Sequence, residues 1–186
     1  MVRKLLLGAA AIFALGGVAH SQIVVLGSSM GKDCYLAVVS NPMPSLAHER
    51  VCTEAIASGT LQGRDLTATF INRGIIRTRM NKIDSALSDY ETAKNRRPNM
   101  GAIYLNEGAA LITMGDSAGA IEVLEKSLDL DTQDPHFAHF NLGLAHEMAG
   151  DPTAAYYSFT RASELEPDWE RPREELERFT VVRNDS

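Results

Sequence analysis

Small and apolar side chains recur along residues 67–169 in a pattern that repeats about every 34 residues. The pattern starts from three glycines, Gly74, Gly108 and Gly143, which are separated by 34 and 35 residues. Twelve residues after each glycine stands an alanine, four residues later a large apolar side chain, and three residues later a small one. Self-similarity at this period is typical of proteins built from stacked structural repeats.

Each unit of this pattern has the features of two antiparallel helices joined by a short turn. In the first unit, Gly74 and Ala86 are small enough to let two helices approach closely, and Tyr90 fills the space one turn further along. The equivalent residues are Gly108, Ala120 and Leu124 in the second unit and Gly143, Ala155 and Phe159 in the third. Because one hairpin cannot bury its apolar face, neighbouring units must stack to complete the core. The pattern therefore predicts an all-α fold.

Turn residues mark the ends of these helices. The two helices of the second unit are separated at Gly115-Asp116, and those of the third at Gly150-Asp151-Pro152. Asp151 can cap the helix that follows it, and Pro152 suits the first helical position. Pro98 and Pro167 end the second helices of their units, because proline cannot continue the hydrogen-bond ladder.

The positions of these residues resemble the consensus of the tetratricopeptide-repeat (TPR) family. The resemblance implies a TPR helical-hairpin solenoid with repeats at 67–100, 101–135 and 136–169. The third repeat matches through His139, Leu142, Gly143, His146, Ala155, Phe159, Ala162 and Pro167; the first through Phe70, Gly74, Ala86, Tyr90, Ala93 and Pro98; and the second through Tyr104, Gly108, Leu111, Ala120 and Leu124. Arg73 and Glu107 stand where the family usually has leucine, and Thr132 replaces a proline.

The segments that flank the three repeats predict further helices. Residues 33–66 read as a degenerate helical hairpin, with a short helix before Asn41-Pro42-Met43-Pro44 and a second from Ser45 to about Ala57. Residues 170–186 read as a capping helix and tail, since Leu176, Phe179 and Val182 form an apolar stripe on a charged helix through about Val182.

The first 21 residues have the features of a secretory signal peptide. Arg3 and Lys4 precede an apolar run from Leu5 to Ala19, and Ala19-His20-Ser21 offers small residues at the two positions that a signal peptidase reads. The alternative is a transmembrane anchor, but the run of about 15 residues is shorter than the roughly 20 that span a bilayer. We therefore expect cleavage after Ser21, no stable membrane anchor, a loosely ordered tail at 22–32, and a periplasmic or secreted protein.

Charge and cysteine content narrow the function further. Signal cleavage would leave 16 basic against 24 acidic residues, a net charge of −8, and such an acidic chain is unsuited to binding nucleic acid. Cys34 and Cys52 are the two cysteines, and in an oxidising compartment an even pair usually forms a disulfide. Antiparallel helices can bring the two within bonding range, although two buried free thiols are the alternative.

The TPR resemblance implies a concave groove lined by the first helix of each hairpin, which in this family binds extended or helical peptides. Carried over by position, the groove residues are Ile71, Asn72, Ile75, Thr78 and Arg79 in the first repeat, Leu105, Asn106, Ala109 and Ile112 in the second, and Phe137, Phe140, Asn141, Leu144 and Met148 in the third.

In each repeat an asparagine stands two residues before the glycine that starts the pattern. These asparagines are Asn72, Asn106 and Asn141. Its amide can donate to and accept from a peptide backbone, or it can bond within the scaffold. We expect Phe137 and Phe140 to be exposed together as an apolar binding patch, unless the extra residue before His136 rotates this helix and buries both.

Other site chemistries find little support in the sequence. Some TPR domains bind a C-terminal carboxylate through a clamp of polar and basic side chains. In this sequence only Asn106 fits such a clamp; the matching positions are Ile71, Ile75, Asn106, Phe137 and Asn141. His139 and His146 occupy places that the family uses for packing, so we expect no metal site. With no catalytic set and no cofactor motif, we expect a non-enzyme that binds a protein or peptide partner. The alternative is a structural subunit of a cell-envelope complex whose groove is filled by its own chain.

Overall fold

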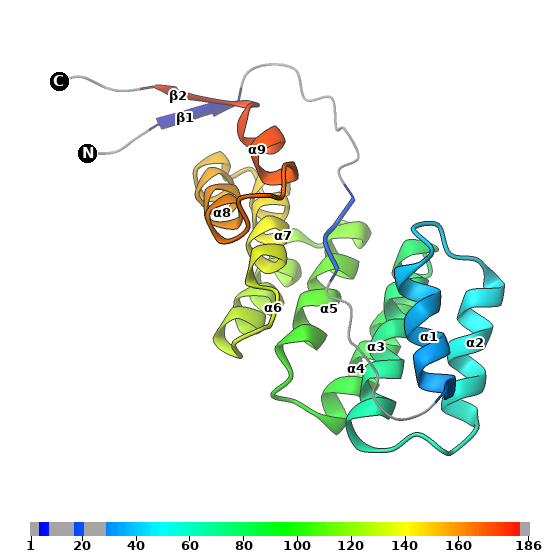
Figure 1. Cartoon of the computed structure of the whole chain (residues 1–186). Helices are drawn as coiled ribbons and strands as arrows, with labels where there is room; N and C mark the ends of the chain where they lie inside the picture. Colours follow the sequence, from blue (N-terminus) through cyan, green and yellow to red (C-terminus); the bar gives the residue numbers. More distant parts are fainter. Residues whose placement is uncertain (1–3, 8–16, 21–28, 183–186) are drawn as a thin grey trace.

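The computed structural model describes residues 4–7, 17–20 and 29–182, and these form nine helices and two short strands (Figure 1). The helices are α1 (Ser29–Val39), α2 (Leu46–Ala57), α3 (Gly63–Arg79), α4 (Ile83–Arg96), α5 (Gly101–Met114), α6 (Ser117–Asp129), α7 (Pro135–Met148), α8 (Pro152–Leu165) and α9 (Arg171–Leu176). The strands are β1 (Lys4–Leu7) and β2 (Phe179–Val182).

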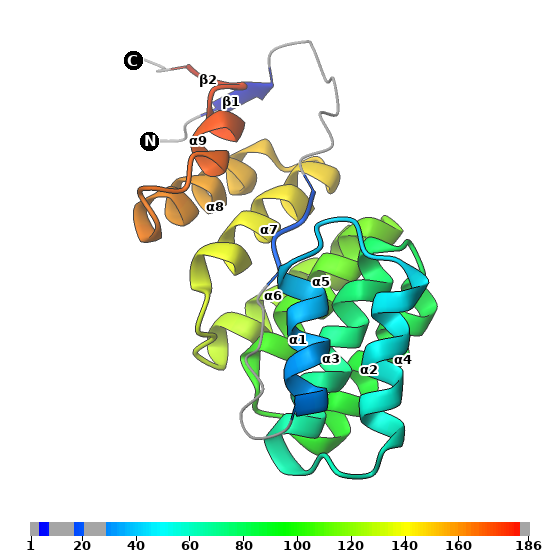
Figure 2. The same cartoon turned by 45° about the vertical axis from the view of Figure 1, so that its right-hand side comes forward.

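Successive helices pack as antiparallel hairpins that stack side by side, as both views show (Figures 1 and 2). The pairs are α1 with α2, α3 with α4, α5 with α6, and α7 with α8. Contacts of α3 with α5, and of α5 with α7, line up the first helices of three neighbouring hairpins. The predicted all-α helical solenoid is therefore confirmed.

The small-against-large contacts inside the hairpins follow the repeat pattern. A Cβ atom built on Gly74 would lie 2.5 Å from the ring of Tyr90, and one on Gly143 would lie 2.5 Å from the ring of Phe159. Gly108 faces Leu124 at the same 2.5 Å. The glycines thus allow the close helix approach that the sequence pattern predicted, and the facing large side chains are fully buried.

The turns between helices use the capping residues expected from the sequence. The Asp116 carboxylate accepts a hydrogen bond from the backbone N–H of Gly119 at 3.0 Å, and Gly115 ends α5 with a φ of 91°. The Asp151 carboxylate accepts from the N–H groups of Thr153 and Ala154 at the start of α8. These bonds satisfy N–H groups that the first turn of a helix leaves without a partner.

A disulfide joins the two helices of the first hairpin. Cys34 on α1 and Cys52 on α2 are fully buried and covalently linked, as their placement suggested. On the chain-entropy model, closing a loop of this length contributes about 3 kcal/mol. The staple lies at the end of the array, where a hairpin has a neighbour on one side only.

Two expectations at the ends of the chain are wrong. The tail expected at 22–32 is helical from Ser29, where α1 begins; residues 21–28 lie outside the described part. The capping helix ends at Leu176 rather than near Val182.

The residues after Leu176 form a strand instead of a helix. Phe179 begins β2, which pairs antiparallel with β1, with Leu7 opposite Phe179. The run Phe-Thr-Val-Val favours extended backbone, and Phe179 is buried with its ring 6.1 Å from that of Phe159. β1 belongs to the segment predicted as a signal peptide.

Candidate binding groove

The residues predicted to line the groove lie on the three first helices that stand next to one another. α3 carries Ile71, Asn72, Ile75 and Arg79; α5 carries Leu105, Asn106 and Ala109; and α7 carries Phe137, Phe140, Asn141 and Leu144. These helices form the inner face of the array. The rest of the chain covers much of this face, in two separate places.

Helix α1 covers the part of the inner face that α3 provides. Ile71 and Ile75 are fully buried and belong to one core cluster with Cys34 and Val38 of α1. Arg79 donates from Nη1 to the backbone carbonyl oxygen of Val38 at 2.8 Å. Ile71 and Ile75 are therefore core residues in this structure and do not line an open groove.

A short segment, residues 17–20, occupies the inner face beside α5 and α7. Both views show it as an extended stretch beside the stacked helices (Figures 1 and 2). Asn141 holds its backbone at two points: Asn141 Nδ2 donates to the carbonyl oxygen of Ala19 at 2.7 Å, and the N–H of Ala19 donates to Asn141 Oδ1 at 2.9 Å. This is the pairing that one strand residue offers to another, supplied here by a side chain.

Apolar contacts also hold residues 17–20, which we call the groove-bound segment. Val18 packs against the cluster of Leu105 and Leu142. Ala19 is 5% exposed and packs in the cluster that contains Phe140 and Phe159. A chain in this position is thus held by backbone hydrogen bonds and by small to medium apolar side chains.

Phe140 is fully buried, so the expected exposed pair of phenylalanines is wrong at this position. Its ring centroid lies 5.5 Å from that of Phe159 and 4.9 Å from that of Trp169, and the Arg171 guanidinium stands 4.6 Å from the ring centre. Phe137 is half-buried, 5.1 Å from the Trp169 ring. Gly143 still faces Phe159, so the segment after the third hairpin covers Phe140 and no rotation of α7 is needed.

The three asparagines do not act alike. Asn106 Nδ2 donates to the carbonyl oxygen of Ala102 at 2.8 Å, a bond within its own helix. Asn141 instead bonds a segment 122 residues away in the chain. Asn106 thus bonds within its own helix, and Asn141 bonds the backbone of another segment.

Comparison with known proteins bears on the family. Residues 101–134, which include α5 and α6, match the family model described as "Tetratricopeptide repeat". Residues 101–134 therefore form one tetratricopeptide repeat. The fold is also similar to a solved structure described as "MamA RS-1 ArsTM double mutant", with a TM-score of 0.60 and 16% identity over 80% of this chain and 82% of that one. No curated protein matches the sequence.

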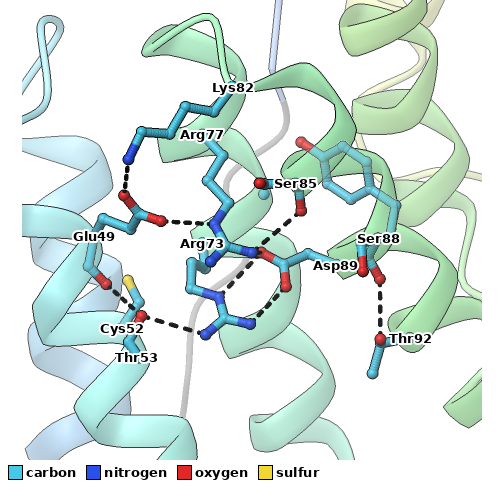
Figure 3. A network of polar contacts seen from close by, with 12 residues as sticks. Glu49, Cys52, Thr53, Arg73, Arg77, Lys82, Ser85, Ser88, Asp89 and Thr92 are labelled. Carbon is cyan, nitrogen blue, oxygen red and sulfur yellow. Dashed lines mark hydrogen bonds and ion pairs between the residues drawn. The ribbon is translucent and has the colours of Figure 1, made fainter. Parts of the chain in front are cut away.

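The charged residues that depart from the TPR consensus have partners. Arg73 forms two hydrogen bonds with the Asp89 carboxylate, at 2.7 and 3.0 Å, and Arg77 bonds the same carboxylate at 2.8 Å (Figure 3). Arg77 and Lys82 both bond Glu49 of α2. Figure 3 shows these side chains meeting between α2, α3 and α4, so this network joins the α1–α2 hairpin to the α3–α4 hairpin. Glu107 pairs with Lys94 of the preceding hairpin at 2.9 Å.

The histidines of α7 pack against neighbouring side chains. The ring of His136 lies 4.1 Å from that of Phe137 and 5.6 Å from that of Trp169. Burial, with a smaller effect of Arg161, lowers the pKa of His139. Across the described ranges no group of three or more histidine, cysteine or acidic residues is placed to hold a metal ion.

A surface cavity of about 440 Å³ lies away from the groove, between the start of α5 and the α6–α7 turn. Arg64, Arg97, Gly101 and Thr132 contribute to its lining. A Cβ atom on Gly101 would lie 3.1 Å from Thr132, so Thr132 packs over the first residue of α5. In the described part of the chain, no helix has the length and apolar character needed to cross a membrane.

Sequence reasoning missed the residues that close the groove. Ala19 was assigned to a signal peptide, Trp169 to the end of the third repeat, and Arg171 to the capping helix and tail. No repeat position points to them, because they lie before and after the array. The only signal was indirect: an asparagine at Asn141 suited to hold a backbone.

Proposed function

We propose that this TPR protein is an exported, periplasmic scaffold that holds an extended segment of a partner protein on the inner face of α5 and α7. The observation that carries the proposal is the two-point hydrogen bonding of Ala19 by Asn141. Bonds to a backbone N–H and carbonyl oxygen do not depend on the side chain, so another extended chain can take the same place.

Removal of the signal peptide would make this place available. The groove-bound segment belongs to residues 1–21, which the sequence marks for cleavage after Ser21. Processing would then leave Asn141 with two unpaired hydrogen-bonding groups beside the apolar side chains that Val18 and Ala19 now cover. Such a surface favours an incoming peptide, because unpaired polar groups and exposed apolar area are both costly. The buried Cys34–Cys52 disulfide is in keeping with an oxidising compartment.

The structural-subunit alternative also has an observation in its favour. α1 and the groove-bound segment together cover much of the inner face, as expected if the groove is filled by its own chain. In that case the outer surfaces of the hairpins would make the contacts in a complex. The two functions differ in one property: a scaffold of the first kind loses residues 17–20, and a self-filled subunit keeps them.

Peptide binding to the processed protein tests the proposal. The probe is a fluorescent peptide with the sequence of residues 14–23, and fluorescence anisotropy gives its affinity. The protein variant Asn141→Ala should bind it at least about tenfold more weakly, because two hydrogen bonds of about 1 kcal/mol each are lost. Asn95→Ala is the matched control, since Asn95 is exposed and bonds Glu91 of its own helix. Equal affinity of the two variants would move the site away from Asn141.

A further inference from the structure

Two arginines lie close enough to the groove-bound segment for their charges to act on His20. Arg171 of α9 donates to the carbonyl oxygen of Gly17 and covers the ring of Phe140. Arg79, at the end of α3, donates to the carbonyl oxygens of Val38 and Asn41. Among the residues that the structure describes, neither guanidinium forms an ion pair with a carboxylate. Burial lowers the pKa of both arginines, so their positive charges are only partly hydrated.

The side chain of His20, on which both of these charges act, is poorly matched to them. Nε2 of His20 is buried and has no hydrogen-bond partner among the described residues. Burial, together with the positive charges of Arg79 and Arg171, lowers the pKa of His20 from 6.5 to about 3, although a hydrogen bond with the backbone of Val18 acts in the opposite direction. The imidazole is therefore neutral here and leaves a polar atom unsatisfied, which is unfavourable in a buried position.

We propose that the natural partner segment carries an aspartate or glutamate in the place of His20, directly after a small residue in the place of Ala19. This rests on the proposed function, that the groove binds an extended peptide. A carboxylate would supply an ion-pair partner and acceptor atoms to two partly buried guanidiniums; Glu174 and Glu175 act on Arg171 electrostatically but form no ion pair with it among the described residues. The small residue follows from the 5% exposure of Ala19 and its packing against Phe140 and Phe159.

This carboxylate site differs from the clamp found in other TPR domains. The usual clamp positions hold Ile71, Ile75 and Phe137, which cannot bind an anion. Here one arginine comes from the end of α3 and the other from α9, outside the repeats. The proposed ligand group is an acidic side chain within an extended chain.

The overall negative charge of the protein opposes the binding of an acidic peptide. The full chain carries a net charge of −6, and removal of residues 1–21 would make it −8. Long-range electrostatics therefore disfavour an acidic peptide. Tighter binding of glutamate than of glutamine would therefore indicate local positive charges, and weaker binding would indicate that the negative charge of the whole protein dominates.

The first experiment uses the protein's own segment as the probe. The full chain is made by cell-free synthesis without membranes, under oxidising conditions, so that residues 17–20 remain attached. His20→Glu and His20→Gln are compared with and without Arg171→Gln, and Trp169, the single tryptophan, reports on the site. We expect His20→Glu to raise the melting temperature above that of His20→Gln, and this difference to disappear with Arg171→Gln and return with Arg171→Lys.

Arg161→Gln is the control for a general charge effect, because Arg161 is exposed and pairs with Glu164 on α8. It should leave the difference between glutamate and glutamine unchanged. Identical melting temperatures of the His20→Glu and His20→Gln chains would overturn the proposal. So would a difference that Arg171→Gln leaves intact.

The second experiment separates this proposal from the proposed function. Peptides with the sequence of residues 14–23, carrying Glu, Gln or Lys in the place of His20, are titrated into the processed protein. We expect the Glu peptide to bind about tenfold more tightly than the Gln peptide at low salt, and the Lys peptide most weakly. Equal binding of all three peptides would contradict the proposed carboxylate site but would still support a peptide-binding groove. Absence of binding by every peptide would reject both.

Discussion

At the scale of single residues, the hairpins depend on pairs of a glycine and a large side chain. Gly143 faces the ring of Phe159, and the same arrangement recurs at Gly74 with Tyr90. The pattern of small and large residues predicted these contacts, because each lies within one hairpin at a fixed spacing. The environment of Asn141 was not predictable in this way, since its partner, Ala19, lies 122 residues away.

Gly143→Leu should be strongly destabilising, because even a Cβ atom at this position would lie 2.5 Å from the Phe159 ring. Overpacking of a tight contact costs about 1–3 kcal/mol, and more where backbone must move. Ala118→Leu is the control, since Ala118 is exposed on α6. Thermal or urea unfolding measures both. If the two variants unfold at the same point as the parent, the hairpin register is wrong.

His20 predicts a pH dependence of groove occupancy in the unprocessed chain. Its pKa falls from 6.5 to about 3 on binding, mainly through burial and then through Arg79 and Arg171. The released segment therefore binds a proton more readily than the bound one, and release becomes more favourable as pH falls from about 6.5 towards 3. Above pH 6.5 this histidine contributes no pH dependence.

Trp169 fluorescence of the unprocessed chain, followed from pH 7 to acid, measures this release. Carboxylates titrate in part of the same range, so His20→Gln provides the comparison: its curve should lack the step that begins near pH 6.5. Superimposable curves for the two chains would show that His20 does not control occupancy.

At the scale of elements, the helical hairpins were predictable and the ends of the chain were not. Turn residues such as Asp116 and Asp151 act locally, so they could be read from the sequence. The strand from Phe179 pairs with β1, which is far away in the chain, and the Phe179 ring packs against Phe159 of α8. A helical spacing of apolar residues could not decide between helix and strand there.

The network around Asp89 should be the main polar link between α2, α3 and α4. Asp89 is 2% exposed and receives hydrogen bonds from Arg73 and Arg77. Asp89→Ala would leave two partly buried guanidiniums without this partner, at a cost of about 3 kcal/mol. Glu164→Ala, which removes an exposed pair with Arg161, should cost about 1 kcal/mol or less. Urea unfolding compares them, and equal midpoints would contradict a special role for Asp89.

At the scale of the whole molecule, the helical hairpins and their flanking segments pack together around the proposed groove. The array supplies Asn141 and the apolar face, α1 covers one end, and Trp169 and Arg171 cover the other. The candidate residues lie on α3, α5 and α7, the first helices of three neighbouring hairpins. Their burial could not be foreseen, because the covering residues carry no repeat signature.

The central claim is that the groove of α5 and α7 takes up an extended peptide once residues 17–20 are removed. The most direct measurement is titration of the fluorescent peptide of residues 14–23 into two preparations, the unprocessed chain and the chain processed after Ser21. Saturable binding to the processed chain, and binding at least about tenfold weaker to the unprocessed chain, is the expected result. Equal binding to both, or binding to neither, would contradict the account.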